Sequence, residues 1–140
     1  MEQRDYLKDQ IDQMGKALAK ILSDLMGLKT KNEPQSALVE TNQQLKTQVD
    51  LDLDKLMRVT ADERQAFLDR ESFNAANLET LAEILKEMGT NAVAKDANYV
   101  TEYFKVALEL LNLADQKSEA ISLERIQKKQ TLEKLIEQYA

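Results

Sequence analysis

The sequence predicts an all-α protein, a helical bundle of about six helices of which two are short. Its 140 residues include only three glycines and one proline, while 43% of them are hydrophobic and 31% are charged. This composition suits long helices with few turns better than strands, which need more β-branched and turn-forming residues. Apolar residues also recur at spacings of three and four, the period of one helix face. At this length we expect a single domain over residues 1–140.

The first predicted helix spans residues 3–29 and carries the strongest apolar stripe in the chain. The stripe consists of Leu7, Ile11, Met14, Leu18, Ile21, Leu25 and Leu28. Its flanks include Gly15, Ala17 and Leu22, where a two-stranded coiled coil usually has charged residues. This favours a bundle helix with a broad buried face over a zipper. Gly15 also indicates a close helix crossing, since glycine otherwise weakens a helix interior.

The second predicted helix, residues 35–50, is a weaker packing partner for this stripe. A link at residues 30–34, which ends in the only proline, precedes it. A polar run interrupts its own apolar positions, so the stripe is buried either within the chain or between two subunits. In the second case the candidate self-association residues are Ile11, Met14, Leu18, Ile21 and Leu25.

The middle of the chain predicts two short helices. Leu53 and Leu56 resume helical spacing after a tight connection. Thr60 and Glu63 then form a capping box, in which the hydroxyl of Thr60 accepts a hydrogen bond from the amide of Glu63. We expect the helix that starts there to end near Arg70.

Three longer helices are expected in the remainder. The first ends at Gly89, which occupies the position typical of a helix C′ residue. The second, residues 96–114, is the most hydrophobic segment of the chain. The third, residues 119–139, has Ser118 or Ser122 as its candidate cap. Arg125, Lys128 and Lys129 are expected on an exposed, salt-bridged face of this last helix.

The segment from Leu78 to Leu113 resembles a degenerate tetratricopeptide-type helix hairpin. The matching positions are Leu78, Leu81, Ala82 and Leu85 in one helix and Ala107, Leu111 and Ala114 in the other. Leucines replace the expected aromatic residues, and no second copy of the pattern follows. Most of the chain is similar to a family of small bacterial proteins of unknown function with a tetratricopeptide-like fold. That similarity rests on Asp5-Tyr6-Leu7, Leu51-Asp52-Leu53-Asp54 and Ser122-Leu123-Glu124-Arg125.

The resemblance implies a fold and, by analogy, a role in protein binding. Residues 1–58 would form an N-terminal helical hairpin with a short helix. Residues 59–140 would form the tetratricopeptide-like helical part, a short stack of helix hairpins. The family carries no activity that could be transferred to this chain.

The composition excludes several kinds of chemistry. The chain has no cysteine and no histidine, so it has no thiol nucleophile, thiolate metal site or imidazole base. We therefore predict no enzymatic activity and no catalytic, cofactor-binding or metal-binding residues. A net charge of −6 opposes nucleic acid as a partner. With neither a targeting segment nor a membrane span in the sequence, a cytoplasmic protein without a membrane partner is expected.

Two acidic groups are candidate sites. Asp50, Asp52 and Asp54 alternate as calcium ligands do, but Gly and Glu are missing from the further loop positions, so these residues are expected to cap and solvate a helix start. Glu79, Glu83 and Glu87 repeat every four residues, a mildly repulsive spacing. The simpler interpretation of these three glutamates is a helix face exposed to solvent. The functional interpretation is an acidic surface that binds a partner.

Tyr99 and Tyr103 are the aromatic candidates. At helical spacing they are typical of core residues, and otherwise they would anchor a partner in a groove. The sequence thus predicts a non-enzymatic helical protein-protein interaction or scaffold module. Its partner would be a second copy of the chain, in a homodimer, or another protein. The alternatives are a purely structural homodimer and, less favoured, a small-molecule or metal-binding protein that uses Glu79, Glu83, Tyr99 and Tyr103.

Overall fold

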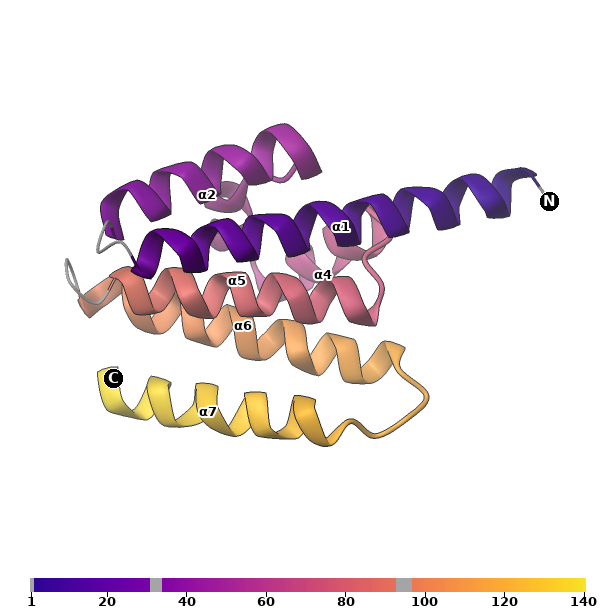
Figure 1. Cartoon of the computed structure of the whole chain (residues 1–140). Coiled ribbons are helices and arrows are strands. Elements are labelled where there is room, and N and C mark those ends of the chain that lie inside the picture. Colours follow the sequence, from indigo (N-terminus) through magenta and orange to yellow (C-terminus); the bar gives the residue numbers. More distant parts are fainter. Residues whose placement is uncertain (1, 31–33, 93–96) are drawn as a thin grey trace.

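The computed structural model describes residues 2–30, 34–92 and 97–140, which form seven helices packed together (Figure 1). They are α1 (Glu2–Thr30), α2 (Pro34–Val49), α3 (Leu53–Arg58), α4 (Ala61–Arg70), α5 (Ala75–Ala92), α6 (Ala97–Lys117) and α7 (Leu123–Tyr139). The described ranges contain no strand, so the all-α prediction is confirmed. The expected total of about six was one too low, because the helices predicted segment by segment, namely two before residue 51, two short ones in the middle and three longer ones after them, already add up to seven. Within these ranges no helix combines the length and apolarity needed to cross a membrane.

The inner part of the α1 stripe lies in the core of the bundle. Leu18, Ile21 and Leu25 are fully buried, and α1 packs against both α2 and α5 (Figure 1). The weak apolar face of α2 is therefore supplemented by α5, whose apolar residues are almost all buried. Three of the five candidate self-association residues, Leu18, Ile21 and Leu25, are thus buried by contacts within the chain. The side chain of Leu28 lies outside the described part of the chain.

The close crossing predicted at Gly15 is confirmed. A Cβ atom at this position would lie 3.0 Å from Oδ1 of Asn77 on α5. Nδ2 of the same asparagine donates a hydrogen bond to the carbonyl oxygen of Ile11 at 3.2 Å. This bond satisfies a buried amide and fixes where α1 crosses the start of α5.

Gly89 does not end a helix, as the sequence suggested, but lies inside α5. A Cβ atom there would lie 2.8 Å from Cε1 of Phe104 and 3.0 Å from Cβ of Tyr103 on α6. The residue is a glycine because the two helices approach closely at this point. The local sequence is typical of a helix end at such a glycine, whereas the packing of the next helix against it decides the outcome.

The three glycines differ in the space around them, and this gives a stability prediction. We expect Gly89→Ala to lower the free energy of unfolding by about 1–3 kcal/mol, because the added methyl group meets a well-packed aromatic ring. The matched control is Gly27→Ala on α1, where a Cβ atom meets nothing within 4 Å. That change should raise stability by up to about 1 kcal/mol, since alanine favours the helix. Urea denaturation of both variants checks this, and equal effects of the two changes would contradict the close approach.

The N-cap residues predicted for the last helix and for the helix after Thr60 are confirmed, although the return bond of the capping box, from the amide of Thr60 to the carboxylate of Glu63, is not found among the described residues. Oγ1 of Thr60 accepts a hydrogen bond from the amide of Glu63 at 3.2 Å, which starts α4. Oγ of Ser122 accepts one from the amide of Arg125 at 3.1 Å, so Ser122 rather than Ser118 caps α7. Such caps depend on neighbours three residues away, which the sequence displays directly.

Candidate functional site

The N-terminal part of α1 is the candidate functional surface. Figure 1 shows that its first turns extend beyond the ends of the other helices. The apolar stripe continues into this extension at Leu7, which is 43% exposed beside the 67% exposed Tyr6, while Ile11 and Met14 are half-buried at the edge of the bundle. We call these four residues the projecting face. Of the predicted self-association residues, only Ile11 and Met14 belong to it.

A groove of about 300 Å³ lies beside the projecting face, between α1 and the ends of α2 and α4. Its apolar lining comes from Ile11, Met14 and Val49. Most of its polar lining is neutral and comes from three glutamines, Gln10, Gln13 and Gln48. The groove thus offers a partner a lining that is more polar than apolar, in which Arg70 and Glu71 are the charged residues.

The α1 helix carries no net charge, although the chain as a whole is acidic. Within Glu2–Thr30 five basic residues balance five acidic ones, so the helix is neutral. The remaining residues therefore carry the whole net charge of −6. A second copy of this acidic chain would therefore meet no net charge on α1; α2 is also neutral, and α3 and α7 each carry a net charge of +1.

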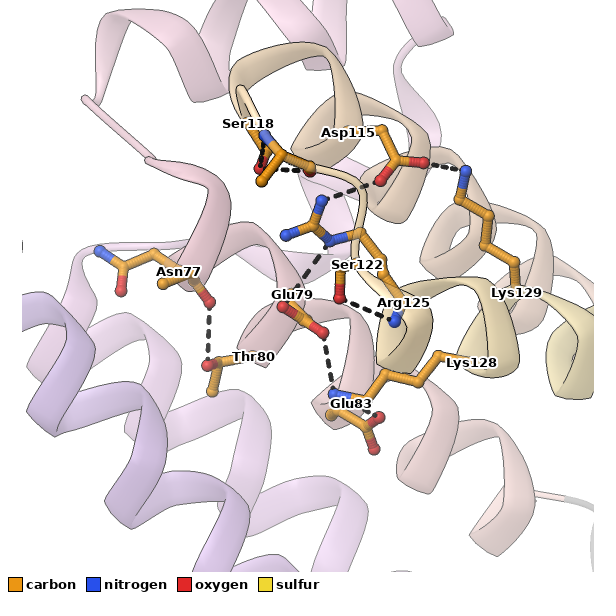
Figure 2. Close-up of polar contacts among 12 residues, drawn as sticks. Asn77, Glu79, Thr80, Glu83, Asp115, Ser118, Ser122, Arg125, Lys128 and Lys129 are labelled. Carbon is orange, nitrogen blue, oxygen red and sulfur yellow. Dashed lines mark hydrogen bonds and ion pairs between the residues drawn. The ribbon is translucent and has the colours of Figure 1, made fainter.

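The row of glutamates on α5 has a partner within the chain. Figure 2 shows Glu79 and Glu83 facing Lys128 of α7, whose Nζ lies 3.0 Å and 3.5 Å from their Oε1 atoms. Burial alone would lower the pKa of Lys128, but the hydrogen bond and charge of Glu79, with help from Glu83, raise it. Glu87 is buried. The interpretation of this row as a solvated face is therefore wrong, and two of its three carboxylates hold α7.

Arg125 was expected on an exposed face but is buried at the start of α7. Its Nη1 donates to Oδ1 of Asp115 on α6 at 2.8 Å, and its Nε lies 3.7 Å from Oε2 of Glu79 (Figure 2). Lys129 donates to the other oxygen of Asp115. Three cations of α7 thus match three carboxylates of α5 and α6, which we call the α7 ion-pair network.

The α7 ion-pair network gives a prediction about pH. Hydrogen bonds from Lys129 and Arg125 lower the pKa of Asp115 below its ordinary value of 3.8. A carboxyl group whose pKa is lower in the folded chain stabilises it above the unfolded pKa, and this contribution is lost as pH falls through the folded pKa. Asp115→Asn should therefore reduce the free energy of unfolding at neutral pH, and the difference from the wild type should shrink below pH 3.8.

Urea denaturation at several pH values measures this difference. Glu119→Gln is the control, because the side chain of Glu119 is exposed and has no ion pair among the described residues. A difference between Asp115→Asn and the wild type that stays constant from neutral to acid pH would contradict the role of the ionised carboxylate.

The structure does not bring Tyr103 together with Glu79 and Glu83. Tyr103 lies on the side of α6 that faces α3, where it lines a hollow with Asp54 and Met57. Burial raises the pKa of its hydroxyl group, and the negative charge of Asp54 adds to this. The side chain of Tyr99 lies outside the described part of the chain.

Of the acidic trio at the start of α3, one residue caps the helix. Oδ1 of Asp52 accepts a hydrogen bond from the amide of Lys55 at 3.3 Å, so this aspartate is the N-cap of α3. Asp50 and Asp54 are exposed. Across the three described ranges, no group of three or more carboxylates is arranged to hold a metal ion.

Arg64 is an important residue that the sequence did not single out. It is buried, and its Nη1 lies 2.7 Å from both carboxylate oxygens of Glu109 on α6. Nε and Nη2 donate to the carbonyl oxygens of Leu56 and Val59 at 3.0 Å and 2.9 Å. Arg64 therefore ties α3 and α4 to α6.

Comparisons of the chain with models of protein families, with curated proteins and with solved structures find no match. The function is therefore inferred from the geometry and charge of the described residues.

Proposed function

We propose that this protein is a non-enzymatic helical interaction module of the cytoplasm that associates with a second copy of itself through the projecting face of α1. The observation that supports this is the division of one apolar stripe. Its inner residues are fully buried, whereas Leu7 at its outer end is 43% exposed on a helix that has run past its neighbours. An unsupported helix end is only marginally stable in water, so a partner would stabilise it.

The neutral charge of α1 is compatible with a second copy as that partner, because two such helices carry no net like charge. Each copy presents both a projecting apolar helix and an adjacent groove, so a two-fold arrangement lets each helix end pack beside the groove of the other. The glutamines that border the groove add no like charges to such a contact. A contact through α5, which carries a net charge of −2, would instead bring like charges together.

A tetratricopeptide-like arrangement of α5, α6 and α7 is part of the proposal. It is supported by the packing of α5 against α6 and of α6 against α7. In such stacks the helices serve as a scaffold for binding surfaces. Here the scaffold would hold α1 on the side of the bundle opposite the α7 ion-pair network, so that the projecting face stays accessible.

Sedimentation velocity over about 1–100 µM protein tests the proposal. The wild type is expected to dimerise with increasing concentration, and Leu7→Glu should raise the dimer dissociation constant by about tenfold or more. The matched control is Val39→Glu, which makes the same kind of change on α2 at a residue that is 65% exposed. This control should dimerise like the wild type, and both variants should keep the wild-type helical circular dichroism.

Two results would contradict self-association at this face. One is a wild-type chain that stays monomeric over the whole concentration range. The other is a dimer that Leu7→Glu and Val39→Glu weaken equally, because the contact would then lie elsewhere or depend only on net charge.

A further inference from the structure

A second apolar surface lies where α6 is linked to α7. Ile121 is 88% and Leu123 75% exposed, and Ile126 is also exposed. Exposed apolar residues that occur singly are ordinary, but three within six positions form a patch that marks a contact surface. We call these three residues the α6–α7 patch. None of them belongs to the projecting face of α1.

The α6–α7 patch is held in a fixed shape beside a hollow. Oγ of Ser118 donates to the carbonyl oxygen of Ala120 at 3.0 Å, and the cap formed by Ser122 fixes the first turn of α7. The hollow has a volume of about 310 Å³, and Ile121 and Ile126 line it together with Glu119. A preorganised apolar surface beside a hollow can bind an apolar side chain without first ordering a loop.

The charges that remain free near the patch are negative. The neighbouring cations are paired within the chain, because Nζ of Lys117 lies 2.7 Å from Oδ1 of Asp69 and Arg125 is paired with Asp115. Glu119 and Glu124 are exposed and have no ion pair among the residues that the structure describes. A partner at this patch therefore meets uncompensated carboxylates beside apolar side chains.

We propose that the α6–α7 patch binds an amphipathic segment of another protein in which apolar side chains are flanked by lysine or arginine. One apolar side chain of the segment enters the hollow between Ile121 and Ile126. Its basic residues pair with Glu119 and Glu124, which speeds association and orients the segment. This chemistry disfavours pairing of the patch with the same patch on a second copy, since the acidic borders of the two patches would repel each other.

Selection from a random-peptide display library, with the full-length chain as bait, tests the proposal. The Ile121→Ser/Leu123→Ser double variant serves for counter-selection. The enriched peptides are expected to combine apolar residues with adjacent lysine or arginine. Their affinity, measured by fluorescence anisotropy, should fall about tenfold or more in the double variant and by a smaller factor in Glu119→Gln/Glu124→Gln.

The Met26→Ser/Val39→Ser double variant is the matched control, because it removes two exposed apolar side chains far along the sequence from the patch. It should bind the peptides with wild-type affinity. The proposal is overturned if no peptide is enriched, if the peptides carry acidic flanks, or if they bind the Ile121→Ser/Leu123→Ser variant as tightly as the wild type. It is also overturned if that variant loses self-association in sedimentation, because the occupant of the patch would then be a second copy.

Discussion

Replacing Ile21 by glutamate should unfold the chain. Ile21 has no exposed surface and packs in the core between α1 and its neighbours. The substitution removes a buried side chain, worth about 2–5 kcal/mol, and adds the cost of burying a carboxylate. The sum approaches the whole stability of an ordinary domain, about 5–15 kcal/mol. Far-UV circular dichroism should show loss of most of the helical signal.

Lys20→Glu is the control for this experiment. It places the same side chain on the same helix, but at an exposed position. Its helical signal and its denaturation midpoint should stay close to those of the wild type. If Ile21→Glu instead gave a folded monomer from a wild-type dimer, the inner stripe would lie between subunits, and its placement in the core would be wrong.

Replacing Arg64 by methionine should lower the free energy of unfolding by about 3 kcal/mol. The guanidinium group makes charge-assisted hydrogen bonds to Glu109 and to the carbonyl oxygens of Leu56 and Val59. Methionine fills a similar volume but leaves these acceptors without their donor. Urea denaturation gives the change, and loss of contacts to Leu56 and Val59 should release α3 from α4.

Lys105→Met provides a comparison on α6. Nζ of Lys105 lies 3.9 Å from Oε1 of Glu102, and both side chains are more than half exposed. An exposed pair of this kind is worth at most about 1 kcal/mol, so its loss should have a small effect. Equal effects of Arg64→Met and Lys105→Met would contradict a clamp formed by Arg64.

Much of the fold could be predicted because its determinants are local. The caps at Thr60 and Ser122 depend on residues three positions away. The helix faces follow from apolar spacing, and both are visible in one short window of sequence. These signals establish which segments are helical, but they do not state which helix covers which face.

The features that the sequence missed depend on contacts between distant segments. Arg64 is buried because Glu109, 45 residues further along the chain, lies opposite it. Arg125 is buried by Asp115 and Glu79 in the same way. Gly89 is required by the ring of Phe104 and not by a helix end. A charged or glycine residue carries no local sign of such a neighbour, so its role could not be read from spacing alone.

The candidate site was predicted in part for the same reason. The α1 stripe was recognised as a surface that needs a partner, and Ile11 and Met14 remain in the projecting face. The division of the stripe at the edge of the bundle depends on how far α2, α4 and α5 extend beside α1. That length is set by tertiary packing, which a stripe on one helix does not encode.

The most direct test of self-association at α1 measures distances between copies. The chain has no cysteine, so single spin labels can be attached at Asp9→Cys or Ser23→Cys, two exposed positions on α1. The two positions lie about 21 Å apart along the helix. Pulsed electron paramagnetic resonance of the dimer should give a shorter distance between labels at position 9 than between labels at position 23. Absence of coupling between copies at position 9, or a shorter distance at position 23, would contradict a dimer joined through the projecting face.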